Sequence, residues 1–122
     1  EKMMALIMMR TQFNEAGFKG IASDPRNRRE AATAGFKRMG WELRDIYYLP
    51  ATNQWMLIAE GDPKKMVAAE ISTMATGGYS SAQCEVITTP EEFLEEAQSA
   101  AELKATFDTP NRDEIDRMLL DE

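Results

Sequence analysis

The chain of 122 residues contains no histidine. Histidine is the most frequent general base in enzymes and, as neutral imidazole, the most frequent metal ligand. Without it, neither a Ser-His nor a Cys-His nucleophile pair can be formed. The single cysteine, Cys84, excludes an intrachain disulfide and gives no sign of an oxidising compartment. We therefore expect a cytoplasmic protein with no metal centre and no cofactor.

Long apolar runs and basic clusters are also scarce. The apolar stretch at residues 3–9 is only seven residues long, too short for a membrane span, and Arg10 follows it with no small-residue cleavage pattern of a signal peptide. The first residue is Glu, which suggests that a start or leader was trimmed. Beyond Arg26, Arg28 and Arg29 there is no basic stripe. We expect neither a membrane nor a nucleic-acid partner.

The acidic excess is confined to the C-terminal part of the chain. Residues 1–90 carry 11 Lys and Arg against 10 Asp and Glu, whereas residues 91–122 carry 3 against 11. The length suits one domain, and the hydrophobic share of 43% is ordinary for a globular chain. We expect one domain over residues 1–98 and an acidic helical tail over residues 99–122.

Four of the five prolines follow a residue that can cap a helix. A side-chain oxygen accepts from the free amides of a first helical turn, and proline is tolerated at the first helical position because it has no N–H to satisfy. The pattern predicts helix starts at Asp24-Pro25, Asp62-Pro63, Thr89-Pro90 and Thr109-Pro110. Apolar stripes at helical spacing follow the first three: Ala32, Phe36 and Met39; Val67, Ile71 and Met74; Phe93, Ala97 and Ala100. Glycines at 40 and at 77–78 suit the ends of the first two helices.

Four segments have strand patterns. WELRDIYYL (residues 41–49) and SAQCEVIT (81–88) alternate in polarity, which predicts edge strands, with a bulge at Arg44-Asp45. MALIMM (4–9) and WMLIA (55–59) are apolar at consecutive positions, which predicts central strands covered on both faces. The element order favours an α+β fold with a ferredoxin-like βαββαβ antiparallel sheet in the order 4-1-3-2.

Two crossover helices can cover only one face of such a sheet. The other face needs a partner, most simply an identical sheet in a two-fold homodimer, as in a dimeric α+β barrel. The C-terminal helix could instead fold over this face or bind the neighbouring protomer.

Three segments in order resemble the GYD-domain family of small bacterial and archaeal proteins. They are NEAGFKGIASDPRNRREAATAGFKRMG, the YYL strand with its hairpin, and MATGGYSSAQCEVITTPEEF, and the similarity spans roughly residues 4–98. The resemblance implies a ferredoxin-like, dimeric α+β-barrel fold and names no function, because the family is largely uncharacterised. Where the family has Gly-Tyr-Asp, this chain has residues 52–55, Thr-Asn-Gln-Trp, so the aromatic is kept in kind and the acid is missing.

Five residues are the candidates for ligand binding. Arg28, Arg29 and Lys19 surround the start of a predicted helix, where amides and dipole also favour an anion, although ion pairing with Glu30 or a solvated face explains them too. Tyr48 and Trp55 are aromatic candidates at the hairpin. Neighbouring strand residues point to opposite faces, so Tyr47 and Tyr48 are not expected to share a pocket.

Other residues that suggest chemistry have simpler structural explanations. Cys84 alternates with polar residues and reads as a small core side chain. The nine methionines could suit Cu(I), but soft apolar packing in a core or dimer interface explains them better. The glutamates at 91, 92, 95 and 96 suit the positive end of a helix dipole rather than a metal cluster.

We therefore expect a homodimer or higher homo-oligomer, associating through the sheet face, that binds a small molecule or a partner in an apolar cleft between sheet and helices. The first alternative is an enzyme similar to the cofactor-independent monooxygenases and isomerases with dimeric α+β barrels, which needs a polar group facing the cleft. Without histidine, its candidates are Tyr48, Arg10, Glu60 and Asp45. The second alternative is a docking module that binds a larger assembly through its acidic tail.

Overall fold

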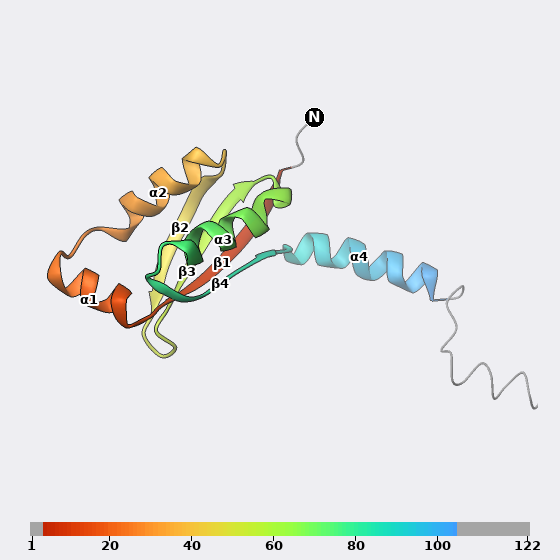
Figure 1. Cartoon of the computed structure of the whole chain (residues 1–122). Helices are drawn as coiled ribbons and strands as arrows, with labels where there is room; N and C mark the ends of the chain where they lie inside the picture. Colours follow the sequence, from red (N-terminus) through yellow and green to blue (C-terminus); the bar gives the residue numbers. More distant parts are fainter. Residues whose placement is uncertain (1–3, 105–122) are drawn as a thin grey trace, which may run out of the picture. The chain divides into compact units, whose positions relative to one another are not determined.

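The computed structural model describes residues 4–104 and divides the chain into two units, Glu1–Ile87 and Thr88–Glu122. The elements are β1 (Ala5–Phe13), α1 (Glu15–Ser23), α2 (Arg28–Arg38), β2 (Glu42–Leu49), β3 (Gln54–Gly61), a 3₁₀ turn (Pro63–Lys65), α3 (Met66–Ala75), β4 (Tyr79–Val86) and α4 (Pro90–Leu103) (Figure 1). Residue 98, the expected domain boundary, lies inside α4. The helix predicted after Thr109 lies outside the described residues.

The four strands form one antiparallel sheet in the order β2-β3-β1-β4. The apolar strands β1 and β3 are central and the alternating strands β2 and β4 are at the edges, as predicted. The register of β2 against β3 shifts between Leu43 and Asp45, so the predicted bulge at Arg44 is confirmed. The α+β class is also confirmed, and the strand order is compatible with a ferredoxin-like fold.

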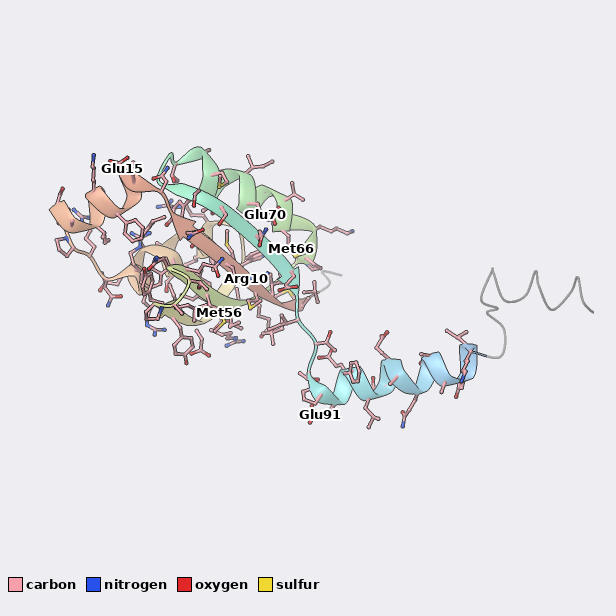
Figure 2. The ribbon with its side chains drawn as sticks, turned by 90° about the horizontal axis from the view of Figure 1, so that it is seen from below. Arg10, Glu15, Met56, Met66, Glu70 and Glu91 are labelled. Atoms are coloured by element: carbon pink, nitrogen blue, oxygen red, sulfur yellow. The ribbon has the colours of Figure 1, made fainter. Side chains whose placement is uncertain are left out.

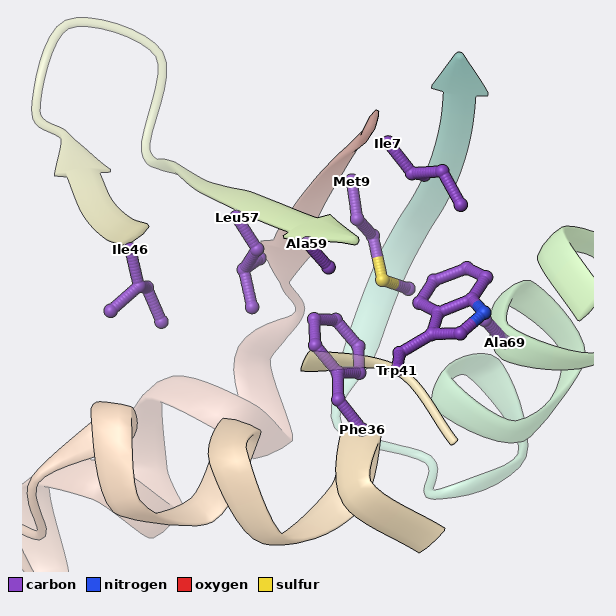
Figure 3. Close-up of a cluster of buried hydrophobic side chains, with 8 residues drawn as sticks. All are labelled: Ile7, Met9, Phe36, Trp41, Ile46, Leu57, Ala59 and Ala69. Carbon is purple, nitrogen blue, oxygen red and sulfur yellow. The ribbon is translucent and has the colours of Figure 1, made fainter. Parts of the chain in front are cut away.

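The core lies between one face of this sheet and helices α2 and α3. On β1, the odd-numbered residues from Ile7 to Phe13 are buried, because alternate side chains of a strand point to the same face. Helix α2 contributes Phe36 and α3 contributes Ala69 (Figure 3). The buried cluster comprises Ile7, Met9, Phe36, Trp41, Ile46, Leu57, Ala59 and Ala69.

The opposite face of the sheet carries the even-numbered residues of β1 and β3. Leu6, Met8, Met56 and Ile58 are half-buried on this face, which we call the open face, and Tyr47 beside them is 53% exposed. The side chains are drawn in Figure 2, where Arg10 and Met56 of this face are labelled. The helices packed against the sheet within residues 4–87 therefore leave an apolar centre exposed here.

The first crossover differs from the prediction. Asp24 does not start a helix. It ends α1, which was not predicted, and its carboxylate pairs with Arg26 at 2.8 Å. Asn14 caps α1 by accepting from the N–H of Gly17, and Asn27 caps α2 by accepting from the N–H of Arg29. Asp62 caps the 3₁₀ turn that leads into α3, which itself begins at Met66. The predicted start after Thr89 is confirmed, and Thr89 forms a full capping box with Glu92.

The inward face of α3 also differs from the prediction. Val67, Ile71 and Met74 point to solvent and are 63%, 63% and 41% exposed. The helix instead turns Met66, Ala69 and Thr73 inward. Ala69 is 2% exposed, and its small side chain lets the helix backbone lie close to the sheet. The apolar stripe on α3 is therefore exposed on the surface. The stripe of Ala32, Phe36 and Met39 on and just after α2 contacts the core, as predicted.

Helix α4 belongs to the second unit. No residue of α4 is buried, so its predicted stripe of Phe93, Ala97 and Ala100 is exposed. Within residues 4–104, no helix combines the length and the apolar character needed to cross a bilayer.

Candidate functional site

A cavity of about 140 Å³ lies between the sheet and helices α2 and α3. The sheet supplies its apolar floor through Met9, Ile46 and Leu57, and α2 supplies Ala32 and Phe36. Gly35 also lines it, and a Cβ added to this glycine would have no heavy atom within 4 Å. A side chain at position 35 would therefore have space where α2 borders the cavity.

Two polar side chains meet at the edge of this cavity. Nη2 of Arg28 donates to the hydroxyl of Tyr79 at 3.0 Å, which joins the first residue of α2 to the first residue of β4. The guanidinium carbon lies 5.8 Å from the centroid of the Phe13 ring, within the range of a cation–π contact. The hydrogen bond and the ring fix the position of a half-buried positive charge.

Trp55 lines the same cavity and has an unsatisfied donor. Its Nε1 is buried and has no hydrogen-bond acceptor among the described residues. An unpaired buried N–H costs about 1–3 kcal/mol. The N–H is covered by protein atoms, so an acceptor reaches it only if neighbouring side chains shift.

An aromatic cluster surrounds these groups. The Phe13 ring lies 5.5 Å from Phe18, 5.2 Å from Tyr79 and 6.2 Å from Trp55, centroid to centroid. Tyr48 packs edge-on against Trp55 at 4.9 Å, and these two residues are direct cross-strand neighbours. Such pairs add stability and fix ring positions.

Arg28 and Tyr79 also line a second, more open hollow, of about 420 Å³. This hollow is bounded by α1 and the turn after it, through Gly20, Ile21 and Asp24. The Asp24 carboxylate is already paired with Arg26, so the acid on this side is neutralised within its own turn.

The structure separates the five candidate ligand-binding residues. Arg28 and Trp55 line the cavity. Tyr48 packs against the ring of Trp55 but does not line the cavity. Its hydroxyl donates to Oδ1 of Asn53 at 3.1 Å. Lys19 is exposed and pairs with Glu15 at 2.9 Å within α1, and Arg29 is exposed on α2. Neither of these two lines the cavity.

Tyr79 is a polar cavity residue that the sequence did not indicate. It follows Gly77 and Gly78, and Gly77 has a positive φ of 81°, so this turn places the tyrosine at the start of β4 opposite Phe13. The two glycines are the signal in the sequence for this turn, although by themselves they predict only the end of a helix.

Three of the four polar groups proposed for the enzyme alternative do not face the cavity. Arg10, Glu60 and Asp45 lie on the open face, on the side of the sheet opposite the cavity. The expectation that they face the cleft is therefore wrong. Tyr48 alone among those candidates is on the helix side.

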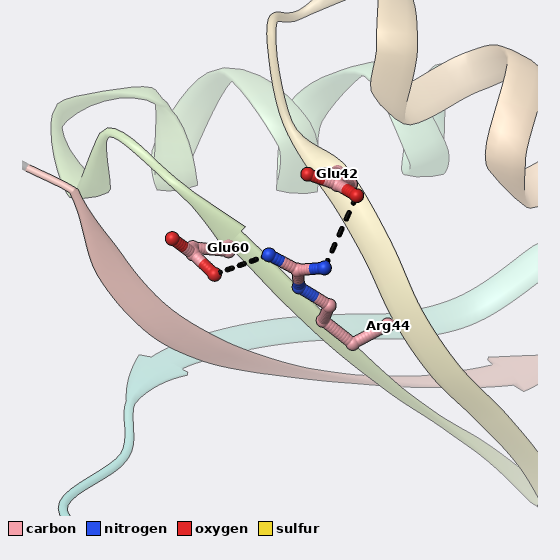
Figure 4. Close-up of polar contacts among 3 residues, drawn as sticks. All are labelled: Glu42, Arg44 and Glu60. Atoms are coloured by element: carbon pink, nitrogen blue, oxygen red, sulfur yellow. Dashed lines mark hydrogen bonds and ion pairs between the residues drawn. The ribbon is translucent and has the colours of Figure 1, made fainter.

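Ion pairs join several of the charged side chains of the open face. Arg10 pairs with Glu85 at 3.7 Å. At the bulge, Arg44 bridges Glu60 at 2.7 Å and Glu42 at 3.1 Å (Figure 4). The hydrogen bond to Glu60, together with both carboxylate charges, raises the pKa of Arg44. These pairs frame the apolar centre of the face.

Cys84 is not placed as a nucleophile. Burial raises the pKa of its thiol to about 11, and the nearby charge of Glu70 acts in the same direction. Its backbone N–H donates to Oε2 of Glu70 at 2.8 Å. Near neutral pH the thiolate is a minor species, so Cys84 acts as a packing residue. Among residues 4–104, no group of three or more His, Cys, Asp or Glu side chains is placed to hold a metal ion.

Fold and cavity together define an α+β protein with a partly apolar chamber between its sheet and its helices. Comparison with protein-family models, with curated proteins and with solved structures finds no match to this chain. The resemblance to the GYD-domain family therefore stays a prediction made from the sequence.

Proposed function

We propose that the protein binds a small, largely apolar molecule in the cavity between its sheet and helices α2 and α3. The observation that carries this proposal is a partly apolar cavity of about 140 Å³ whose lining includes Arg28 and the ring of Trp55. Small-molecule sites are concave and mostly apolar, and side chains that border an empty hollow lack dispersion partners on that side. A bound molecule would supply those partners.

The residue at position 35 supports the same proposal. Glycine inside a helix is less stable than alanine by about 0.5–1 kcal/mol. Gly35 lies within α2 and has open space where its side chain would be. A larger residue there would both favour the helix and fill the cavity. The chain thus keeps the cavity open at a local cost in stability.

Binding without catalysis is favoured over the enzyme alternative by the direction of the polar groups. Three of the four candidate groups lie across the sheet from the cavity, and the thiol of Cys84 is protonated near neutral pH. The docking alternative depends on residues 99–122, most of which lie outside the described residues. Of these hypotheses, binding is the one that the lining of the cavity supports.

The proposal includes the finer fold expected from the GYD resemblance, a ferredoxin-like homodimer in the cytoplasm. The strand order and the half-buried apolar centre of the open face support an identical sheet as its partner. The charges at the rim, paired within the sheet, fit an interface whose centre is apolar.

Replacing Gly35 with leucine is expected to abolish binding of benzyl alcohol, a water-soluble one-ring probe, because the new side chain occupies the cavity. Thermal stability should be kept or raised. Chemical-shift changes of the Trp55 indole N–H measure the binding. Gly20→Leu is the matched control, since Gly20 also has open space around its Cβ position but does not line this cavity. Unchanged binding by Gly35→Leu, or no binding by the unaltered protein, would reject the proposal.

Light scattering is expected to give the mass of two chains at micromolar concentration, and Met8→Lys should convert the dimer to monomer. Met8 lies at the centre of the open face beside Glu85, so a lysine is tolerated in the monomer but resists burial against a second sheet. Met74→Lys makes the same change on the exposed stripe of α3 and should leave the dimer intact. A monomeric unaltered protein, or dissociation by Met74→Lys alone, would contradict a sheet-face dimer.

A further inference from the structure

The charge of Arg28 is not balanced by an acid. Arg10, Arg26 and Arg44 each pair with a carboxylate. Arg28 is half-buried, yet it contacts a neutral hydroxyl and a neutral ring, and it has no ion pair among the described residues. Burying part of a charge without a counter-charge is unfavourable. An anion bound at Arg28 would remove that cost.

The surroundings of Arg28 fix the position of its guanidinium and leave N–H donors for such a ligand. Its bond to Tyr79 uses one of five guanidinium N–H groups, which leaves donors for a planar, two-oxygen acceptor. Arg28 is also the first residue of α2, an eleven-residue helix whose dipole adds positive potential at that end. Asp24, the acid beside the adjoining hollow, is already paired with Arg26 and does not compete.

The cavity beside Arg28 limits the rest of the ligand. An apolar protein cavity of about 150 Å³ is known to accept benzene. The present cavity, of about 140 Å³, therefore has room for about one six-membered ring. On the sheet side the cavity is lined by Met9, Ile46 and Leu57, whose side chains are uncharged and apolar.

We propose that the ligand is a small carboxylic acid with a single ring or an equally short apolar body, whose carboxylate binds Arg28 while the body occupies the cavity. This inference rests on the proposed function and adds the charge and size of the ligand. The Tyr79 hydroxyl orients the guanidinium and can itself donate to the carboxylate. The position of Arg28 at the cavity edge places the charged end towards the open hollow and the ring towards the core.

Benzoate and benzyl alcohol test the inference because they share a ring and differ in charge. The unaltered protein should bind benzoate about tenfold or more tightly than benzyl alcohol, as a charge-assisted hydrogen bond provides. Arg28→Gln should reduce that ratio to about one. Arg29→Gln is the matched control, because it removes the same charge from the next, exposed residue and should leave the ratio unchanged. Tyr79→Phe should reduce the ratio less than Arg28→Gln.

The outcomes separate the two proposals. Equal binding of both probes by the unaltered protein would overturn the carboxylate inference and leave the cavity binder standing. Binding of neither probe would overturn the proposed function. An equal loss of the ratio in Arg28→Gln and Arg29→Gln would also overturn the inference, since it would indicate only the general surface charge. Arg28→Lys, which keeps the charge, guards against loss of fold and should retain part of the preference for benzoate.

Discussion

Gly61→Ala is expected to lower the free energy of unfolding by about 2–3 kcal/mol, because the added methyl group has no room. A Cβ on Gly61 would lie 2.1 Å from Cδ1 and 2.6 Å from Cγ of Trp41. Trp41 cannot move aside easily. It is 3% exposed, packs edge-on against Phe36 at 5.5 Å, and donates its Nε1 hydrogen to the carbonyl of Asp62 at 3.1 Å.

Urea denaturation measures this effect, and Gly20→Ala provides the matched control. Gly20 lies inside α1 with nothing within 4 Å of its Cβ position, so the same substitution should raise stability by about 0.5–1 kcal/mol. The two variants should therefore shift the urea midpoint in opposite directions. A Gly61→Ala protein as stable as the unaltered one would show that the strand and Trp41 are not packed as described.

Ile7→Ala is expected to cost about 3 kcal/mol, because Ile7 is fully buried at the centre of the core and its truncation leaves a cavity. Ile71→Ala removes the same atoms from a side chain that is 63% exposed on α3 and should change stability by less than about 0.5 kcal/mol. Thermal and urea unfolding of both variants give the comparison. Similar losses at the two positions would mean that Ile71 is covered in solution, for instance by another chain.

The sheet could be predicted from the sequence because its signals are local. Consecutive apolar residues marked β1 and β3 as central, and alternation marked β2 and β4 as edges, so the strand order followed from few alternatives. The interruption at Arg44-Asp45 marked the bulge for the same reason. The polarity of adjacent residues shows whether a strand is buried on one face or on both.

The helices were less predictable, because capping residues and apolar stripes have more than one use. Asp24 before a proline matched a helix start, but its carboxylate pairs with Arg26, and Asn27 caps α2 instead. On α3, the larger apolar side chains, such as Ile71, suggested the inner face. Packing favoured the face with Ala69, because a small residue permits closer contact with the sheet.

The site could be predicted only in part. Arg28 and Trp55 were identified by their chemical types, but their meeting at one cavity depends on the register of three strands. Tyr79 joins them because β4 pairs with β1 so that Tyr79 lies opposite Phe13. A cleft between sheet and helices was predicted, but the pairing of Phe13 with Tyr79 is not visible in local patterns, so the contact between Arg28 and Tyr79 could not be foreseen.

The two tryptophans occupy different environments, so the fluorescence of each reports on a different part of the protein. Trp55 lines the cavity, whereas Trp41 lies outside it, sealed against Gly61 and hydrogen-bonded to Asp62. A molecule entering the cavity contacts one indole only, that of Trp55, while unfolding exposes both to water. The fluorescence of Trp41→Phe protein thus follows occupancy of the cavity, and that of Trp55→Phe protein follows the integrity of the core.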